Sequence, residues 1–294
     1  MLFVEGFFVL SGYVLCNQIE LINHNQSLIK TFLIRRWMRT IPLFLIALII
    51  FSIVFNSESN DFFKYLFLIQ DFKIDFLNQE YFYILWSLSI EEYFYLLFPL
   101  VLYFLKDITF TYKVYLFIIL IYFLKFLSTF YQLSFEDLRT LTFLRLDSIA
   151  FGVLLHIHKD LLLKKIGLVF IISIFSIFFI FSETDFANTS ELRSLTYIFM
   201  MQILSMTSLI IFEFIYSLRK NINKTLIIFF RIIANQTYSI YLFHLIFIYV
   251  VQGINISNLN KIGIVFYLIL ISFFSFVIYH TFEKNILKHR PSYK

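Results

Sequence analysis

The strongest constraint in this sequence is a series of long, uninterrupted apolar segments separated by short charged clusters. Lipid offers no hydrogen-bond partners, so a segment at membrane depth must be a helix or a strand of a closed barrel. Barrel strands would alternate apolar and polar residues, whereas these segments are continuously apolar. Only 15% of the 294 residues are charged, against about 25% in an average soluble domain. The sequence therefore predicts an all-α, polytopic transmembrane helical bundle.

The apolar segments predict about nine spans, which we treat as one membrane domain covering residues 1–294. No linker or internal repeat divides the chain. Most segments approach the roughly 20 residues that a helix needs to cross a bilayer. The spans are predicted at 1–16, 41–55, 81–105, 114–131, 140–158, 166–182, 195–217, 233–252 and 262–282.

Lysines and arginines are distributed unevenly between alternate loops, and this predicts the orientation. Seventeen of the 24 fall on one side, five on the other and two inside spans. Cytoplasmic loops carry the excess of Lys and Arg, so we expect the C-terminus in the cytoplasm. Nine crossings would leave Met1 outside, whereas one more helix before Met1 would put both ends inside. The charges therefore predict a chain that is truncated at its N-terminus.

Composition and motifs exclude several classes of function. A single cysteine, Cys16, rules out a disulfide framework and a multi-cysteine metal site within one chain. The net charge of +5 is small and its basic residues are dispersed, so we expect no nucleic-acid partner. No P-loop, dinucleotide fingerprint, zinc-binding helix pair or nucleophile elbow is present. We expect neither a metal nor a permanently bound cofactor.

Ionisable residues inside predicted spans are the best candidates for function, because each costs at least ~2.5 kcal/mol at the centre of a membrane helix. Glu91 and Glu92 lie about ten residues into the third span, which is roughly 15 Å deep. Arg145 and Asp147 lie in the fifth span, two residues apart, so each needs a partner on another helix. Arg145 with Glu91 or Glu92 is the expected pair. A purely structural ion pair is the alternative to a catalytic role.

Two further groups are candidates for substrate binding, although each could also have a purely structural role. His244 lies in the eighth span and is either a packing residue or a group that contacts substrate. Arg35, Arg36 and Arg39 lie just before the second span, on its cytoplasmic side, where basic residues fix topology and contact anionic lipid. Arg35 and Arg39 share a helical face, so they could also hold the phosphates of a ligand.

Six segments together resemble the acyltransferase-3 family of integral membrane acyltransferases. The most specific are WSLSIEEYFY at 86–95 and FFVLSGY at 7–13. The others are RRWMRTIP at 35–42, RLDSIAFG at 145–152, SIYLFH at 239–244 and YHTFEK at 279–284, where the family usually continues with proline and this chain has Asn285. The segments follow the order of the family from the first residues to the last ten.

The resemblance implies transfer of an acyl group, commonly acetyl from acetyl-CoA as co-substrate, to a hydroxyl of a cell-surface glycan or lipid-linked sugar at the bacterial inner membrane. The family has about ten crossings and a characteristic His in its first helix, which here would precede Met1. On this basis Arg35, Arg36 and Arg39 would hold the CoA phosphates. Glu91 or Glu92 would orient or deprotonate the acceptor, directly or through that His.

Within the same hypothesis, Arg145 and Asp147 would shape the cavity and His244 would hydrogen-bond substrate. The same buried charges leave two alternatives open. One is a proton-coupled transporter or flippase of glycan intermediates, although the chain lacks the internal repeats common in transporters. The other is an inactive, truncated relative that still inserts into the membrane.

Overall fold

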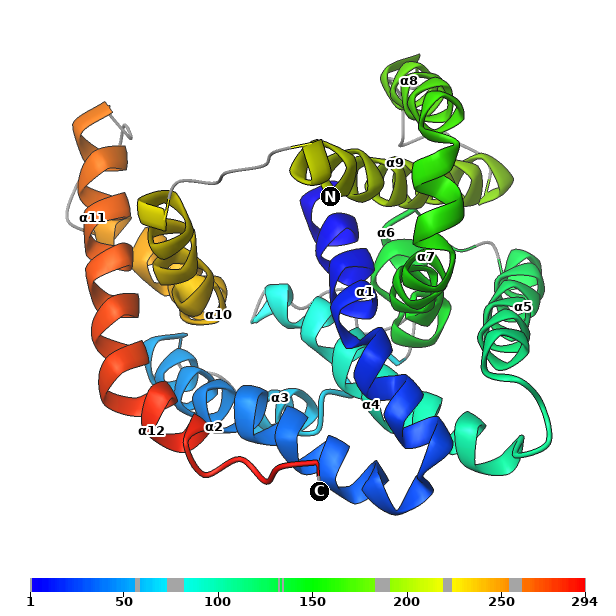
Figure 1. Ribbon diagram of the computed structural model, residues 1–294. Coiled ribbons are helices and arrows are strands. Elements are labelled where there is room, and N and C mark those ends of the chain that lie inside the picture. The colour runs from blue at the N-terminus through cyan, green and yellow to red at the C-terminus, as the bar shows by residue number, and fades with distance from the viewer. Residues whose placement is uncertain are drawn as a thin grey trace. The chain divides into compact units, whose positions relative to one another are not determined.

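The computed structural model describes residues 2–55, 59–72, 82–131, 133, 135–182, 191–218, 224–253 and 261–293. Within these ranges the regular structure is helical throughout (Figure 1). The main helices are α1 (Leu2–His24), α2 (Ile29–Phe55), α4 (Trp86–Phe104), α5 (Phe110–Ser128), α7 (Leu146–Lys164), α8 (Ile166–Ser182), α9 (Glu191–Leu218), α10 (Lys224–Gly253) and α11 (Lys261–Ile278). Shorter helices are α3 (Ser59–Leu66), α6 (Phe135–Thr140) and α12 (Lys284–Leu287). The all-α prediction is confirmed.

Each of the nine predicted spans overlaps one of the nine main helices in the described part of the chain, although α1 ends eight residues later than predicted, α2 begins twelve residues earlier and α10 begins nine residues earlier. Seven helical segments are individually long and apolar enough to cross a membrane. The segment 142–164, which contains α7, and α8 pass the same test only together, bent by 115°, so the total is eight if the bent pair is one span. The chain is therefore a multi-pass membrane protein.

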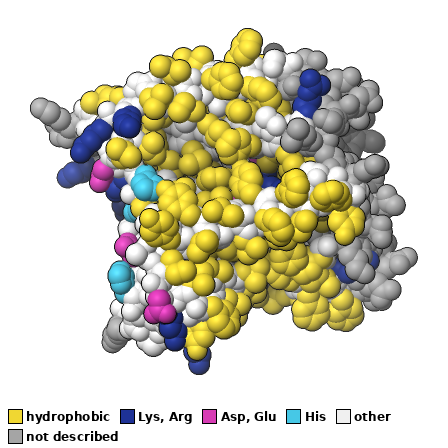
Figure 2. Space-filling model, turned by 90° about the vertical axis from the view of Figure 1, so that its right-hand side faces the viewer, with side chains coloured by type: hydrophobic (Ala, Val, Ile, Leu, Met, Phe, Trp, Pro, Cys, Tyr) yellow, Lys and Arg dark blue, Asp and Glu magenta, His cyan; other side chains and the backbone are white. Residues whose placement is uncertain are grey.

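Large apolar side chains are exposed along these helices, as expected for surfaces that face lipid. On α8 they include Ile171, Ile174 and Phe178, and on α5 they include Ile119 and Phe123. Figure 2 shows apolar side chains covering much of the visible face, with charged groups near its edges. In a soluble protein such a surface would be a large interaction site. In a membrane protein it is the surface that contacts the lipid chains.

The chain forms two compact units, each with its own packing. Unit 1 comprises Met1–Phe32 and Phe67–Lys220, and unit 2 comprises Leu33–Leu66 and Asn221–Lys294. Unit 1 therefore holds α1 and α4 to α9, and unit 2 holds most of α2 together with α3 and α10 to α12. That residues 1–294 act as one functional domain stays a prediction.

Helices α1 and α7 of unit 1 run parallel and cross very closely at two glycines. A Cβ on Gly12 would collide with the carbonyl oxygen of Ile149, and a Cβ on Gly152 would collide with that of Val9. Small residues at such a crossing let two membrane helices approach backbone to backbone. This contact fixes the start of α1 beside the start of α7, where the charged residues lie.

Helix α4 packs in unit 1 against α1 and α5 through aromatic rings. Trp86 meets Phe8 of α1 edge-on at 5.9 Å between ring centroids. Phe98 meets Phe117 of α5 in the same way at 5.1 Å. Because α4 begins at Trp86 rather than at 81, Glu91 lies only about 8 Å along the helix at 1.5 Å per residue. The depth of Glu91 in the membrane stays a prediction.

Candidate functional site

A buried ion pair joins the starts of α1 and α7 in unit 1. The guanidinium of Arg145 donates from Nη2 to Oε1 of Glu5, and Ser148 Oγ donates to Oε2 of the same carboxylate at 3.3 Å. Glu5, Arg145 and Ser148 are all fully inaccessible to solvent. Arg145 directly precedes α7, and the parallel crossing with α1 places Glu5 opposite it.

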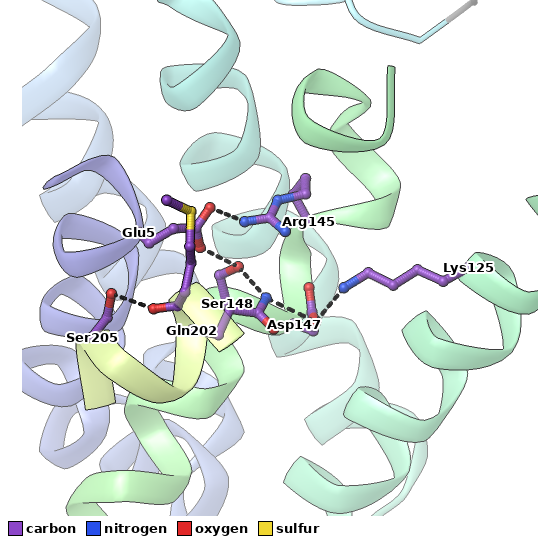
Figure 3. Close-up of polar contacts among 8 residues, drawn as sticks. Glu5, Lys125, Arg145, Asp147, Ser148, Gln202 and Ser205 are labelled. Carbon is purple, nitrogen blue, oxygen red and sulfur yellow. Dashed lines mark hydrogen bonds and ion pairs between the residues drawn. The ribbon is translucent and has the colours of Figure 1, made fainter. Parts of the chain in front are cut away.

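A second ion pair extends this network to α5 and α9 (Figure 3). Lys125 Nζ lies 2.6 Å from Oδ2 of Asp147. Gln202 of α9 donates from Nε2 to the same oxygen at 3.1 Å and to Ser148 Oγ at 2.7 Å. Four helices thus meet around two acids and two bases, and the formal charge of this network is zero.

Several polar atoms of this network have no hydrogen-bond partner among the described residues. They are Nε and Nη1 of Arg145, Oδ1 of Asp147 and Oε1 of Gln202. Thr142 Oγ1, three residues before Arg145, is also buried without a hydrogen-bond partner among these residues. Buried polar groups normally have partners, so these atoms offer both donors and acceptors to a water molecule or to a hydroxyl-bearing substrate.

The two glutamates of the predicted site lie on the first turns of α4, and both are buried. Ser11 Oγ of α1 donates to Oε1 of Glu91 at 2.5 Å. Ser89, in the same segment, accepts a hydrogen bond of 2.7 Å from Nε2 of Gln70. The two most specific motifs, FFVLSGY and WSLSIEEYFY, are therefore in direct contact through side chains 80 residues apart.

The expected partner of Arg145 was wrong. We predicted Glu91 or Glu92, and the ion pair is formed with Glu5 instead. Sequence reasoning also missed Lys125 and Gln202 as members of the network. Glu5 and Lys125 did carry a signal, because each is a charge inside an apolar helix that needs a partner elsewhere. Gln202 carried none, since a single glutamine in a long helix is unremarkable.

Asp71 is a further acid that sequence reasoning did not select. It lies between α3 and α4, outside the spans, and its backbone oxygen accepts from the amide of Thr142 at 3.3 Å. Burial raises the pKa of its carboxyl to about 7, against an opposing hydrogen bond from Gln70. An acid with a pKa near neutrality suits proton transfer, and its backbone contact places it beside the segment that leads into α7.

The remaining predicted residues belong to unit 2. His244 lies on α10, half-buried, with Nδ1 2.7 Å from the backbone oxygen of Tyr241. One turn earlier on α10, Ser239 Oγ donates to Oε1 of Glu283. Glu283 ends a π-helical turn, Tyr279–Glu283, and such turns occur frequently at functional sites. The SIYLFH and YHTFEK motifs are thus joined by a buried hydrogen bond.

The predicted phosphate-binding arginines lie near the start of α2, also in unit 2. Arg36 is buried, Arg35 is half-buried and Arg39 is exposed. Arg35 Nη1 donates to the backbone oxygen of Pro291 in the C-terminal segment. The predicted site residues therefore form two sets: Glu91, Glu92, Arg145 and Asp147 in unit 1, and Arg35, Arg36, Arg39 and His244 in unit 2.

Comparison with known proteins gives one match. Residues 1–280 match the family model Acyl_transf_3, described as an acyltransferase domain. Neither the comparison with curated proteins nor that with solved structures found a match. The match covers the motifs in both units, from FFVLSGY at 7–13 to the start of YHTFEK at 279–284, and so confirms the resemblance seen in the sequence.

Proposed function

The chain belongs to the acyltransferase-3 family, and we propose that it transfers an acyl group, with acetyl the first candidate, from acyl-CoA to a hydroxyl of a cell-surface glycan or a lipid-linked sugar. The family match over residues 1–280 is the observation that carries this proposal. Buried acids and an arginine alone would suit a transporter equally well. We place the enzyme in the bacterial inner membrane with a cytoplasmic C-terminus, in accord with its loop charges.

The reaction needs one proton transfer and one exchange of bonds. The acceptor oxygen attacks the thioester carbonyl, the carbon–sulfur bond breaks, and an ester and a free CoA thiol are formed. The hydroxyl proton leaves the acceptor and ends on the thiolate. A positioned carboxylate that first accepts this proton contributes typically 10²–10⁴-fold to such a reaction.

Glu91 is our first candidate for that carboxylate, with Glu92 beside it as the second. The hydroxyl of Ser11 already donates to Glu91 at 2.5 Å, and this is the contact that an acceptor hydroxyl would make with a general base. We assign Ser11 a positioning role toward Glu91.

We assign the other predicted residues supporting roles in the same reaction. The network of Arg145 and Asp147 would fix α1, α5, α7 and α9 around the acceptor side, and its unpartnered atoms would receive sugar hydroxyls. Arg35, Arg36 and Arg39 would bind the CoA phosphates, because the guanidinium fork matches the geometry of phosphate oxygens. His244 would hydrogen-bond substrate.

Loss of acyl-CoA thioester, followed with a thiol reagent, tests this function in purified protein supplied with candidate glycans. We expect Glu91→Gln or Glu92→Gln to reduce the rate at least ~100-fold. Glu20→Gln is the matched control, because Glu20 is an exposed glutamate of α1. Full activity in both single variants would remove these glutamates from the mechanism.

The transporter alternative is favoured by one observation, the row of buried charges on α1, α5 and α7. Sealed vesicles separate the two functions. Uptake of a lipid-linked sugar or glycan without consumption of acyl-CoA would identify a transporter, whereas ester formation that is stoichiometric with released CoA would identify the enzyme. Absence of both activities would leave the inactive relative.

A further inference from the structure

Two segments of unit 1 cross near the starts of α4 and α7. The segment that carries Gln70 and Asp71, between α3 and α4, meets the 3-10 turn Thr142–Leu144 that leads into α7. The Thr142 amide donates to the backbone oxygen of Asp71 at 3.3 Å. Gln70 also ties the first segment to α4, because its Nε2 donates to Ser89 Oγ at 2.7 Å. These contacts gather polar side chains from three parts of the chain.

Three buried side-chain atoms at this crossing have no hydrogen-bond partner within the ranges that the structure covers. They are Gln70 Oε1, Asp71 Oδ2 and Thr142 Oγ1. Gln70 is only 4% exposed and Thr142 is fully inaccessible, whereas Asp71 is half-buried. Because buried polar atoms normally have partners, these atoms are suited to a ligand that brings several hydroxyl groups.

Aromatic rings lie directly beside these atoms. Phe72 follows Asp71 in the chain, and its ring centroid lies 4.7 Å from those of Tyr93 and Phe143. The rings of Tyr93 and Phe143 are 6.0 Å apart, so the three rings form one cluster. Phe143 is 37% exposed and the other two residues are half-buried. The cluster is therefore partly accessible to a ligand.

We infer that the crossing and the ring cluster together form a subsite for a sugar ring of the acyl acceptor. This inference rests on the proposed function and names the part of the protein that recognises the acceptor. A pyranose combines an apolar face of C–H groups with a rim of hydroxyls. Ligand sites of this kind are lined by apolar and aromatic side chains, with a few polar groups that fix orientation. The residues of the subsite are Gln70, Asp71, Phe72, Tyr93, Thr142 and Phe143.

Anchoring in the membrane interface is the alternative explanation for the rings, since aromatic residues are enriched there. Lipid chains carry no hydrogen-bond donors, however, and could not satisfy the acceptors Gln70 Oε1 and Asp71 Oδ2. Burial raises the pKa of the Asp71 carboxyl to about 7, so at neutral pH this group can donate to a sugar hydroxyl as well as accept from one. The combination of rings with buried polar atoms favours the sugar.

The loop charges predict which side of the membrane the subsite faces. The neighbouring loops carry Lys64, Lys73 and Arg139, which belong to the side with only five of the 24 basic residues. That side is expected to lie outside the cytoplasm. A cell-surface glycan, or the sugar of a lipid-linked intermediate, would reach the protein there.

The test uses the full chain in nanodiscs with an equimolar mixture of the methyl glycosides of glucose, galactose, mannose, rhamnose and N-acetylglucosamine. Saturation-transfer NMR with irradiation of aromatic protons shows which glycosides bind, and titration gives the dissociation constants. We expect saturation to reach the ring C–H protons of at least one glycoside. Phe143→Ala should weaken that binding about fivefold or more, because an aromatic contact is lost. Phe130→Ala, which removes a ring that is 72% exposed and contacts Phe126, is the matched control and should change binding less than about twofold.

Thr142→Val separates a ligand site from a structural contact. The variant replaces a buried hydroxyl by a methyl group of similar size, so the melting temperature without sugar should stay the same or rise. Binding of the glycoside should nevertheless weaken about fivefold, because a hydrogen bond to the ligand is lost. Thr129→Val is the matched control and should leave binding unchanged, since Thr129 Oγ1 donates to the backbone oxygen of Phe126 at 2.7 Å.

Three results would overturn the inference. One is the absence of saturation transfer to every glycoside in the original chain. Another is unchanged binding in both Phe143→Ala and Thr142→Val. The third is a lower melting temperature of Phe143→Ala in nanodiscs with glycoside binding intact, which would assign the rings to lipid anchoring. If Phe143→Ala both unfolds more easily and loses binding, Phe143→Tyr keeps the ring, and retained binding in that variant supports the subsite while lost binding counts against it.

Failure of the subsite and failure of the proposed function give different results. If the original chain binds a glycoside through Phe143 and Thr142 but transfers no acyl group, the subsite stands and the acyltransferase activity fails. If the chain transfers acyl groups, and both variants leave glycoside binding and the Michaelis constant for the acceptor unchanged, the activity stands and the subsite fails.

Discussion

Replacing Glu5 by Gln changes a neutral network into one that carries a single positive charge. In the structure the Glu5 carboxylate receives the guanidinium of Arg145 and the hydroxyl of Ser148. Neither Glu5 nor Arg145 is accessible to solvent, so Arg145 could not recover hydration after the substitution. The variant therefore isolates the energy of one buried charge whose partner has been removed.

The expected loss of stability is about 3–5 kcal/mol, the range observed when one member of a buried ion pair is removed. The double variant Glu5→Gln with Arg145→Met should lose less than the sum of the single variants. It removes the orphan charge and restores a net charge of zero around Asp147 and Lys125. A well-packed apolar replacement of a buried pair is often close to neutral.

Reversible unfolding in mixed detergent micelles, followed by circular dichroism, gives the free energy of unfolding of the original chain, the two single variants and the double variant. Glu20→Gln on the same helix is the control and should change stability by less than about 0.5 kcal/mol, because its side chain is exposed. Additive losses in the double variant, or a loss in Glu5→Gln no larger than in Glu20→Gln, would refute the reasoning.

Three further predictions test other parts of unit 1. Gly12→Ala should destabilise the protein by about 1–3 kcal/mol and lower its melting temperature, because the new Cβ would collide with the Ile149 carbonyl. Gly6→Ala is the control and should not lower the melting temperature, because the space around Gly6 is open. Ser11→Ala should lower kcat about tenfold with little change in KM if Ser11 positions Glu91, and an equal change in both constants would contradict this. The pKa of Asp71 is raised to about 7 in the folded protein. The folded state therefore binds more protons than the unfolded state between about pH 4 and 7, and the free energy of unfolding falls as pH rises through this range. Thermal melts at pH 5 and 8 should therefore show that Asp71→Asn removes the part of this loss that falls between these pH values, about 2–3 kcal/mol. An unchanged pH dependence would disprove the shift.

Local sequence patterns were sufficient to predict where the helices lie. Each apolar segment between charged clusters became a helix, because backbone groups in lipid can be satisfied in few other ways. The same patterns predicted the first and last residues of the helices less well. Tyr83–Leu85 is a 3-10 turn and α4 begins only at Trp86, although the apolar character continues to earlier residues.

Pairings between helices were the part that sequence could not supply. Arg145 could have met any acid at the same depth, and the choice of Glu5 over Glu91 follows from the close parallel crossing of α1 and α7 at Gly12 and Gly152. The contact of Ser11 with Glu91 depends on the same geometry. The motifs identified the residues that matter, but the glycines determined which of them touch.

Charge balance bears on how the buried ionic network of unit 1 stabilises the fold. The network of Glu5, Lys125, Arg145 and Asp147 is neutral within itself, so it needs no ion from outside and can hold four helices together. A neutral network should change little in stability with added anions, whereas Glu5→Gln leaves the Arg145 charge without its partner.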